Sequence, residues 1–229
     1  MRKALSLFSR SLSQTRTMSA FYIHAVNTLN VPHEQVSDIL RFQHVYAVST
    51  LDRLIHELVS VGCLEIFLGK RIPTEKFSSL SFKSDILMHI KKDIYDACTP
   101  ESIITTASSM IDRELRGSLK FVSFQAVDKI NDWLGVIWEE KQKFYKLAEE
   151  MGISGNDANE RAKNLKQKLT VTVGRRHNIA HEADIDPVTE QKREITKAEV
   201  DSAIDFISAF GNAIGKFVTD ASCYTNTQV

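Results

Sequence analysis

The chain has 229 residues, of which 43% are hydrophobic and 25% are charged, a composition typical of a globular protein rather than a disordered one. Its formal net charge is zero, so overall charge gives no argument for a nucleic-acid partner. Four prolines and nine glycines are too few for an all-β protein, which needs a turn about every 8–12 residues.

The N-terminal segment differs from the rest in charge. It contains four basic residues and no acid up to His33, and it is rich in serine. Two interpretations are open: an organellar transit peptide, or a basic amphipathic helix that packs on the domain or touches an anionic partner. We therefore separate a basic extension or helix at residues 1–33 from a helical domain at residues 34–229.

Helical periodicity dominates the remaining chain. Apolar residues at steps of three and four predict a long helix from Glu34 to Leu68, with Pro32 and Gly69 at its boundaries. The later elements, in chain order, are a loop or short helix at 69–83, helices at Asp85–Ala97, Glu101–Leu115 and Phe124–Met151, a basic helix from near Asp157, and a final helix that starts at the Thr196–Glu199 capping box.

Strand-like alternation is weak and occurs at Thr170–Val173 and Arg193–Ile195. There is no internal repeat and no low-complexity linker. These patterns predict a single all-α protein, an up-and-down helical bundle with an N-terminal helical extension.

The cysteines and the hydropathy of the chain indicate in which cellular compartment the protein is expected. Three widely separated cysteines never form a CxxC pair, which suits a reducing compartment and offers no disulfide framework or zinc site. No apolar run reaches the roughly 18–20 residues of a membrane span. We expect a cytoplasmic protein without a membrane partner.

The densest group of polar residues is the stretch GRRHNIAHEADIDP, from Gly174 to Pro187. On a helix, His177 and His181 share one face, and Arg176 lies about 140° round from His181. Histidine exchanges protons near neutral pH, and arginine stabilises charge on phosphate oxygens. This pairing suits phosphodiester chemistry, and in RNA the 2′-hydroxyl can be the nucleophile without a metal-activated water.

Two other interpretations of this stretch are open. The acids Glu182, Asp184 and Asp186 could form a salt-bridged helix end, paired with Arg175 or with a neighbouring helix. They could also bind a hard cation, although Pro187 stands where an EF-hand loop has its glycine. We favour structural pairing and expect no metal and no cofactor.

The stretch from Arg176 to His181 resembles the R-x(4–6)-H signature of the HEPN superfamily (higher eukaryotes and prokaryotes nucleotide-binding domain). The wider RRHNIAHEADIDP is similar to the RiboL-PSP-HEPN branch, as is Asp52-Arg-Leu-Ile-His-Glu-Leu58 followed by Gly69-Lys-Arg71. The resemblance covers roughly residues 42–217 and leaves the first 33 residues without a family signal.

The resemblance implies a helical bundle and a metal-independent endoribonuclease whose active site is shared between two protomers. Arg176 would stabilise the scissile phosphate and His181 would act as acid and base, while His177 and Asn178 would position the phosphate or each other. The products would be a 2′,3′-cyclic phosphate and a 5′-hydroxyl. A homodimer would supply an acid on one side of the phosphate and a base on the other.

Further residues would support this site. A basic run would flank the cleft and attract the RNA backbone, and a plain solvated helix face is the alternative. Asp52 and His56 would either support the residues of the cleft from behind or form a salt bridge on the surface. The basic run consists of Arg161, Lys163, Lys166, Lys168 and Arg175.

We therefore expect an endoribonuclease that cuts RNA in a defence, toxin–antitoxin or stress role, with an antitoxin or defence-system protein as a possible partner. The alternative is a non-catalytic HEPN module that binds RNA or a nucleotide, or that scaffolds a complex. A more distant option is a metal-dependent nuclease that uses the acidic triplet.

Overall fold

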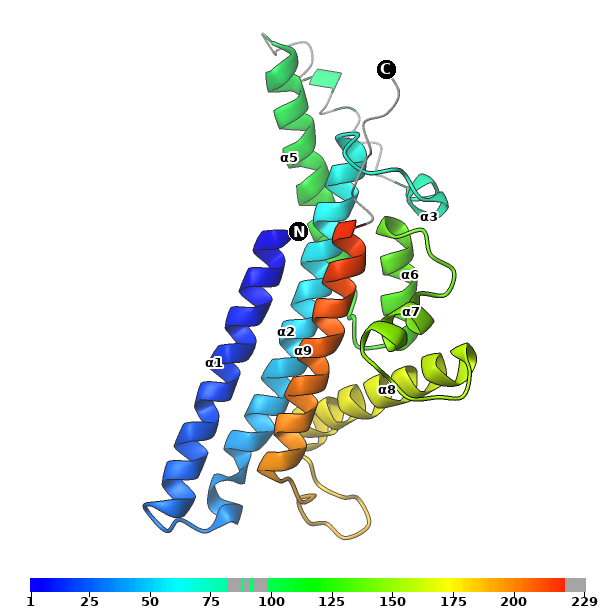
Figure 1. Cartoon of the computed structure of the whole chain (residues 1–229). Coiled ribbons are helices and arrows are strands. Elements are labelled where there is room, and N and C mark those ends of the chain that lie inside the picture. The colour runs from blue at the N-terminus through cyan, green and yellow to red at the C-terminus, as the bar shows by residue number, and fades with distance from the viewer. Residues whose placement is uncertain (82–87, 89–90, 93–98, 221–229) are drawn as a thin grey trace.

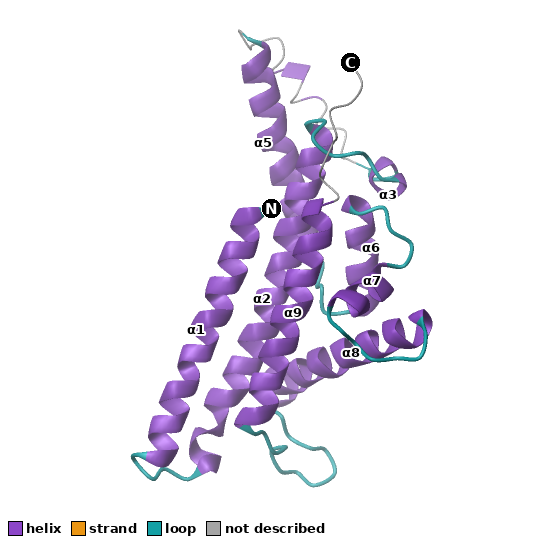
Figure 2. Cartoon of the chain, in the orientation of Figure 1, coloured by secondary structure: helices purple, strands orange, loops and turns teal. Residues whose placement is uncertain are grey.

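A computed structural model describes residues 1–81, 88, 91–92 and 99–220. Its regular elements within those ranges are helices joined by loops, which confirms the all-α class (Figure 2). The expected helix at Asp85–Ala97 lies largely outside the described residues. The elements are α1 (Arg2–Asn27), α2 (His33–Phe67), α3 (Glu75–Ser78), α5 (Pro100–Leu119), α6 (Val127–Ile137), α7 (Lys143–Glu150), α8 (Ala158–Glu182) and α9 (Lys197–Asp220).

The long helix α2 is the centre of the molecule, and α1 and α9 lie along it (Figure 1). The helix α1 runs antiparallel to α2, as in a hairpin, whereas α9 runs in the same direction as α2. The helix α8 crosses this trio obliquely, and α6 and α7 pack beside it. The expected up-and-down order holds for the hairpin of α1 and α2, whereas the oblique α8 departs from it.

The N-terminal helix packs on the rest of the protein through its apolar face. Phe8 and Leu12 are each 3% exposed and belong to the same hydrophobic cluster as the residues of α2 and α9. Gly211 of α9 makes room for the Phe8 ring, because a Cβ at that position would overlap it. This arrangement matches the amphipathic-helix interpretation of the first 33 residues.

The expected single helix at Phe124–Met151 is wrong, because the chain leaves helical geometry at Trp138. Two carbonyls that would accept the next helical hydrogen bonds are taken by distant side chains: Thr74 Oγ1 donates to Val136 O at 2.8 Å, and Arg71 Nη1 donates to Ile137 O at 3.0 Å. Trp138 itself stacks on Phe217 with ring centroids 5.2 Å apart. Tertiary contacts thus end α6 where local periodicity continues.

The helix α8 carries the polar stretch at its C-terminal end. Its N-cap is Asp157, whose side chain accepts a hydrogen bond from the backbone N–H of Glu160 at 2.8 Å. The weak strand-like pattern at Thr170–Val173 lies inside this helix and is wrong, and Arg193–Ile195 forms no strand either. The capping box at Thr196–Glu199 is confirmed by reciprocal hydrogen bonds at the start of α9.

None of the helices in the described ranges combines the length and the apolar character needed to cross a membrane.

Candidate functional site

The C-terminal turn of α8 presents two histidines to solvent. His177 and His181 are both exposed, and their ring centroids lie 4.7 Å apart with the planes inclined by 42°. This contact follows from their spacing, because residues four apart on a helix lie on one face. Two exposed imidazoles thus lie in contact near the end of the helix.

Arg176 points to a different neighbour. Its Nη1 donates a hydrogen bond to Oε1 of Gln125 at 3.1 Å, in the loop before α6. The Nε of the same guanidinium is buried and has no hydrogen-bond partner among the described residues. The structure therefore places Arg176 against Gln125, and the two histidines against each other.

A hollow of about 480 Å³ borders this turn on the side of α6. His177 and Gln125 line it together with Lys129, which supplies a positive charge. The ring of Phe121 is also part of its wall and is 88% exposed. An exposed aromatic ring and two cationic or titratable side chains surround one open space.

Asp184 anchors the chain just after the histidines. Its side chain is fully buried, and its Oδ2 accepts hydrogen bonds from Arg41 Nε and Arg175 Nη2, each at 2.8 Å. Ala183 and Asp184 both adopt the left-handed conformation, with φ of 51° and 60°. The backbone N–H of Asp184 donates to the carbonyl of Asn178, which closes the end of α8.

The other two acids of the triplet serve the same loop. Asp186 accepts hydrogen bonds from the backbone N–H groups of Val188 and Thr189, which lower the pKa of its carboxyl. Arg193 lies 3.9 Å from Glu182 and 3.7 Å from Asp186. The acids are thus paired with arginines of this loop, of α8 and of α2, as the structural interpretation predicts. No group of three acids, histidines or cysteines within the described residues is placed to hold a metal ion.

The basic run does not share one surface. Arg175 turns inward to Asp184, and Arg161 donates to the carbonyl of Gly155 at 3.2 Å. The ammonium groups of Lys166 and Lys168 lie over the rings of Phe144 and Phe206, which belong to different helices. Lys163 is exposed.

Asp52 and His56 support the loop that holds Gln125. Asp52 Oδ1 accepts the backbone N–H of Phe124 at 2.5 Å, and His56 lies edge-on to the Phe124 ring at 4.6 Å. The two side chains also lie 3.6 Å apart, as an i,i+4 pair. This chain of contacts runs from Asp52 through Phe124 to the residue that bonds Arg176.

Sequence reasoning missed Gln125, Phe121 and Arg41. The bond between Arg176 and Gln125 spans 51 positions, and Arg41 reaches Asp184 across 143 positions. The pattern around Gln125 carries no signal for such a contact. A solitary arginine in the apolar stripe of α2 was the available hint for Arg41, because a buried cation requires a partner.

Comparison of the chain with known proteins adds no relative. No protein-family model matches it, no curated protein matches it, and no solved structure matches it. The site itself consists of two exposed imidazoles in contact, an arginine whose Nε has no hydrogen-bond partner among the described residues, and an aromatic-walled hollow beside them.

Proposed function

We propose that the C-terminal turn of α8 is one half of an RNA-cleaving site of HEPN type, completed by a second copy of the chain. The observation that carries the proposal is the exposed pair of His177 and His181, directly beside Arg176. These three side chains provide proton transfer and charge stabilisation in one helical turn. The activity that we propose is therefore that of a metal-independent endoribonuclease.

The reaction follows from the chemistry of these groups. An imidazole removes the proton of the ribose 2′-hydroxyl, whose oxygen attacks the adjacent phosphorus. The bond to the 5′-oxygen breaks, and an imidazolium protonates that oxygen as it leaves. The products are a 2′,3′-cyclic phosphate and a 5′-hydroxyl, and Arg176 stabilises the extra negative charge on the phosphate oxygens.

A second copy of the chain would place a base and an acid on opposite sides of the phosphate. The base and the acid must act on opposite sides of the phosphorus, whereas both histidines of one protomer occupy one helix face. A two-fold axis beside this face would bring a second pair from the other direction. Exposed apolar side chains in the next loop, Ile185 at 42% and Val188 at 88%, supply surface for such a contact.

The hollow beside His177 suits a single-stranded substrate. Phe121 exposes its ring, and bases stack on exposed aromatic rings irrespective of their identity. Lys129 on the same wall would pair with a phosphate. In this proposal one nucleotide next to the scissile bond occupies the hollow.

The test is cleavage of a mixed-sequence single-stranded RNA by wild type, Arg176→Ala and His181→Ala, with His24→Ala as an exposed histidine control on α1. We expect loss of at least about 100-fold for the first two variants, the scale of a lost acid–base or charge-stabilising group, and no change for the control. Cleavage should persist in EDTA and leave cyclic phosphate ends.

Two results would refute the catalytic proposal. Equal cleavage by all the variants would assign the activity to another site or to a contaminant. RNA binding without any cleavage at stoichiometric protein would instead identify a non-catalytic module.

A defence, toxin–antitoxin or stress role is part of the proposal, and growth arrest on expression of wild type but not of His181→Ala would support it.

A further inference from the structure

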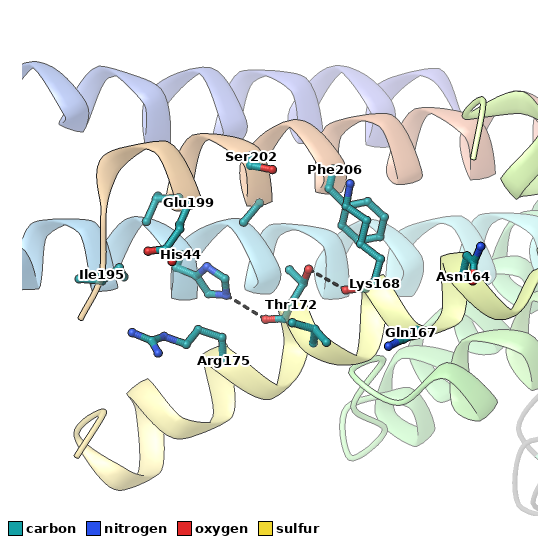
Figure 3. A pocket seen from close by; sticks show the side chains of 13 residues that line it. His44, Asn164, Gln167, Lys168, Thr172, Arg175, Ile195, Glu199, Ser202 and Phe206 are labelled. Atoms are coloured by element: carbon teal, nitrogen blue, oxygen red, sulfur yellow. Dashed lines mark hydrogen bonds between the residues drawn. The ribbon is translucent and has the colours of Figure 1, made fainter. Parts of the chain in front are cut away.

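A second cavity lies away from the histidine pair, between α8 and α9 (Figure 3). It has a volume of about 620 Å³, within the range of pockets that hold small molecules. Val171, Val200, Ala203 and Phe206 give it apolar walls. Neither Arg176, His177 nor His181 lines it.

A buried histidine of α2 lies on the inner side of this cavity. His44 is 6% exposed, and its Nε2 lies 2.8 Å from the carbonyl oxygen of Thr172. Because a carbonyl accepts but does not donate, Nε2 carries the proton and Nδ1 is left as a hydrogen-bond acceptor. Burial lowers the pKa of the ring, so His44 is neutral at physiological pH.

Positive charge is concentrated along the α8 side. The ammonium of Lys168 lies 5.1 Å from the centre of the Phe206 ring. None of the ion pairs found among the described residues includes Lys168. Arg175 lines the same cavity, and Asp184 is shared between its guanidinium and that of Arg41. One acid of the lining, Glu199, is occupied as the cap of α9.

We propose that this cavity binds a small organic anion with an aromatic or otherwise flat apolar body. The body packs between Ala203, Val171 and Phe206, and its carboxylate, sulfonate or phosphate pairs with Lys168. A donor on the same molecule can bond Nδ1 of His44. The site is separate from the proposed RNA-cleaving turn, and its existence does not depend on that activity.

Two fluorescent probes test the proposal on the full chain. The anionic probe 8-anilinonaphthalene-1-sulfonate carries the expected charge, and N-phenyl-1-naphthylamine has the same aromatic body without it. We expect saturable, one-site binding of the anionic probe that weakens about tenfold in Lys168→Gln, while binding of the neutral probe stays within about twofold. Lys163→Gln, a neighbouring exposed lysine on α8, is the matched control and should change neither.

A second variant tests the place of binding. Ala203→Trp fills the cavity and should abolish binding of both probes while the circular dichroism spectrum of the protein is kept. The proposal is overturned if Ala203→Trp binds as wild type does, or if Lys168→Gln and Lys163→Gln behave alike. It is also overturned if Ala203→Trp lowers the molecular mass in solution, because the groove would then be a contact between copies of the chain.

Discussion

Replacing Asp184 by asparagine tests whether a buried ion pair holds the end of α8. The carboxylate is fully buried, and both guanidiniums that bond its Oδ2 do so at 2.8 Å. Asparagine has nearly the same size and tolerates the left-handed backbone at φ 60°, so the substitution removes the charge and little else. Loss of one partner of a buried pair costs about 3–5 kcal/mol, and we expect about 3 because Arg175 is partly exposed.

The measurement is thermal and urea unfolding followed by circular dichroism. For a protein of this size about 1 kcal/mol corresponds to roughly 2–4 °C, so the midpoint should fall by about 6–12 °C. Asp186→Asn is the matched control: it lies two residues away, and an amide oxygen can still accept the hydrogen bonds of Val188 and Thr189. If the two variants differ by less than about 1 kcal/mol, the anchoring role of Asp184 is refuted.

Three further predictions concern separate parts of the structure, and each is checked by the same unfolding measurement. Gly211→Ala should destabilise the protein by about 1–3 kcal/mol, because the new methyl group overlaps the Phe8 ring. The control Gly174→Ala has open space around it on α8 and should stabilise the protein by about 0.5–1 kcal/mol. Equal effects of the two substitutions would refute the packing of α1 on α9. Ala183→Gly should stabilise by about 0.5–1 kcal/mol, since glycine adopts φ 51° without strain, and a loss of stability would contradict this. Burial lowers the pKa of His44 from 6.5, so the contribution of the neutral ring to stability is complete above pH 6.5 and is lost as the pH falls toward the folded-state pKa. The wild type should therefore lose stability more steeply than His44→Gln between pH 7 and pH 5. Parallel stability curves would refute the lowered pKa of His44.

Local signals in the sequence predicted where helices begin. Pro32 precedes α2, Thr99 and Pro100 start α5, and Asp157 caps α8, each within a residue or two of the predicted position. These signals are reliable because a cap satisfies the free N–H groups of its own first turn. They need no information about the rest of the fold.

The break after α6 could not be predicted in this way. The carbonyls of Val136 and Ile137 are bonded by Thr74 and Arg71, more than 60 positions earlier. The apolar periodicity of the segment continues through the break, so the pattern indicates one helix. The strand-like pattern at Thr170–Val173 failed for the related reason that packing on α2 and the bundle overrides β-propensity.

The candidate site likewise contains contacts that the sequence predicted and contacts that it could not predict. The contact of His177 with His181 follows from a spacing of four, and the sequence predicted it. The pairing of the acidic residues with Arg175 was also predicted, and Asp184 forms it. Gln125, the partner of Arg176, depends on the tertiary fold. Arg175 was also expected to flank the RNA cleft, whereas its partly exposed side chain bonds Asp184.

The two adjacent arginines have different roles at one helix end, anchoring for Arg175 and the proposed charge stabilisation for Arg176. Arg175 and Arg176 project about 100° apart, so when the first bonds Asp184 the second faces Gln125 at the edge of the hollow. The anchor thereby fixes the rotation of the turn that exposes the histidines. The two roles are separable by experiment: Asp184→Asn should lower both the stability of the protein and the proposed cleavage. Arg176→Ala should abolish cleavage with a stability loss of about 1 kcal/mol or less, because its one hydrogen bond joins partly exposed side chains.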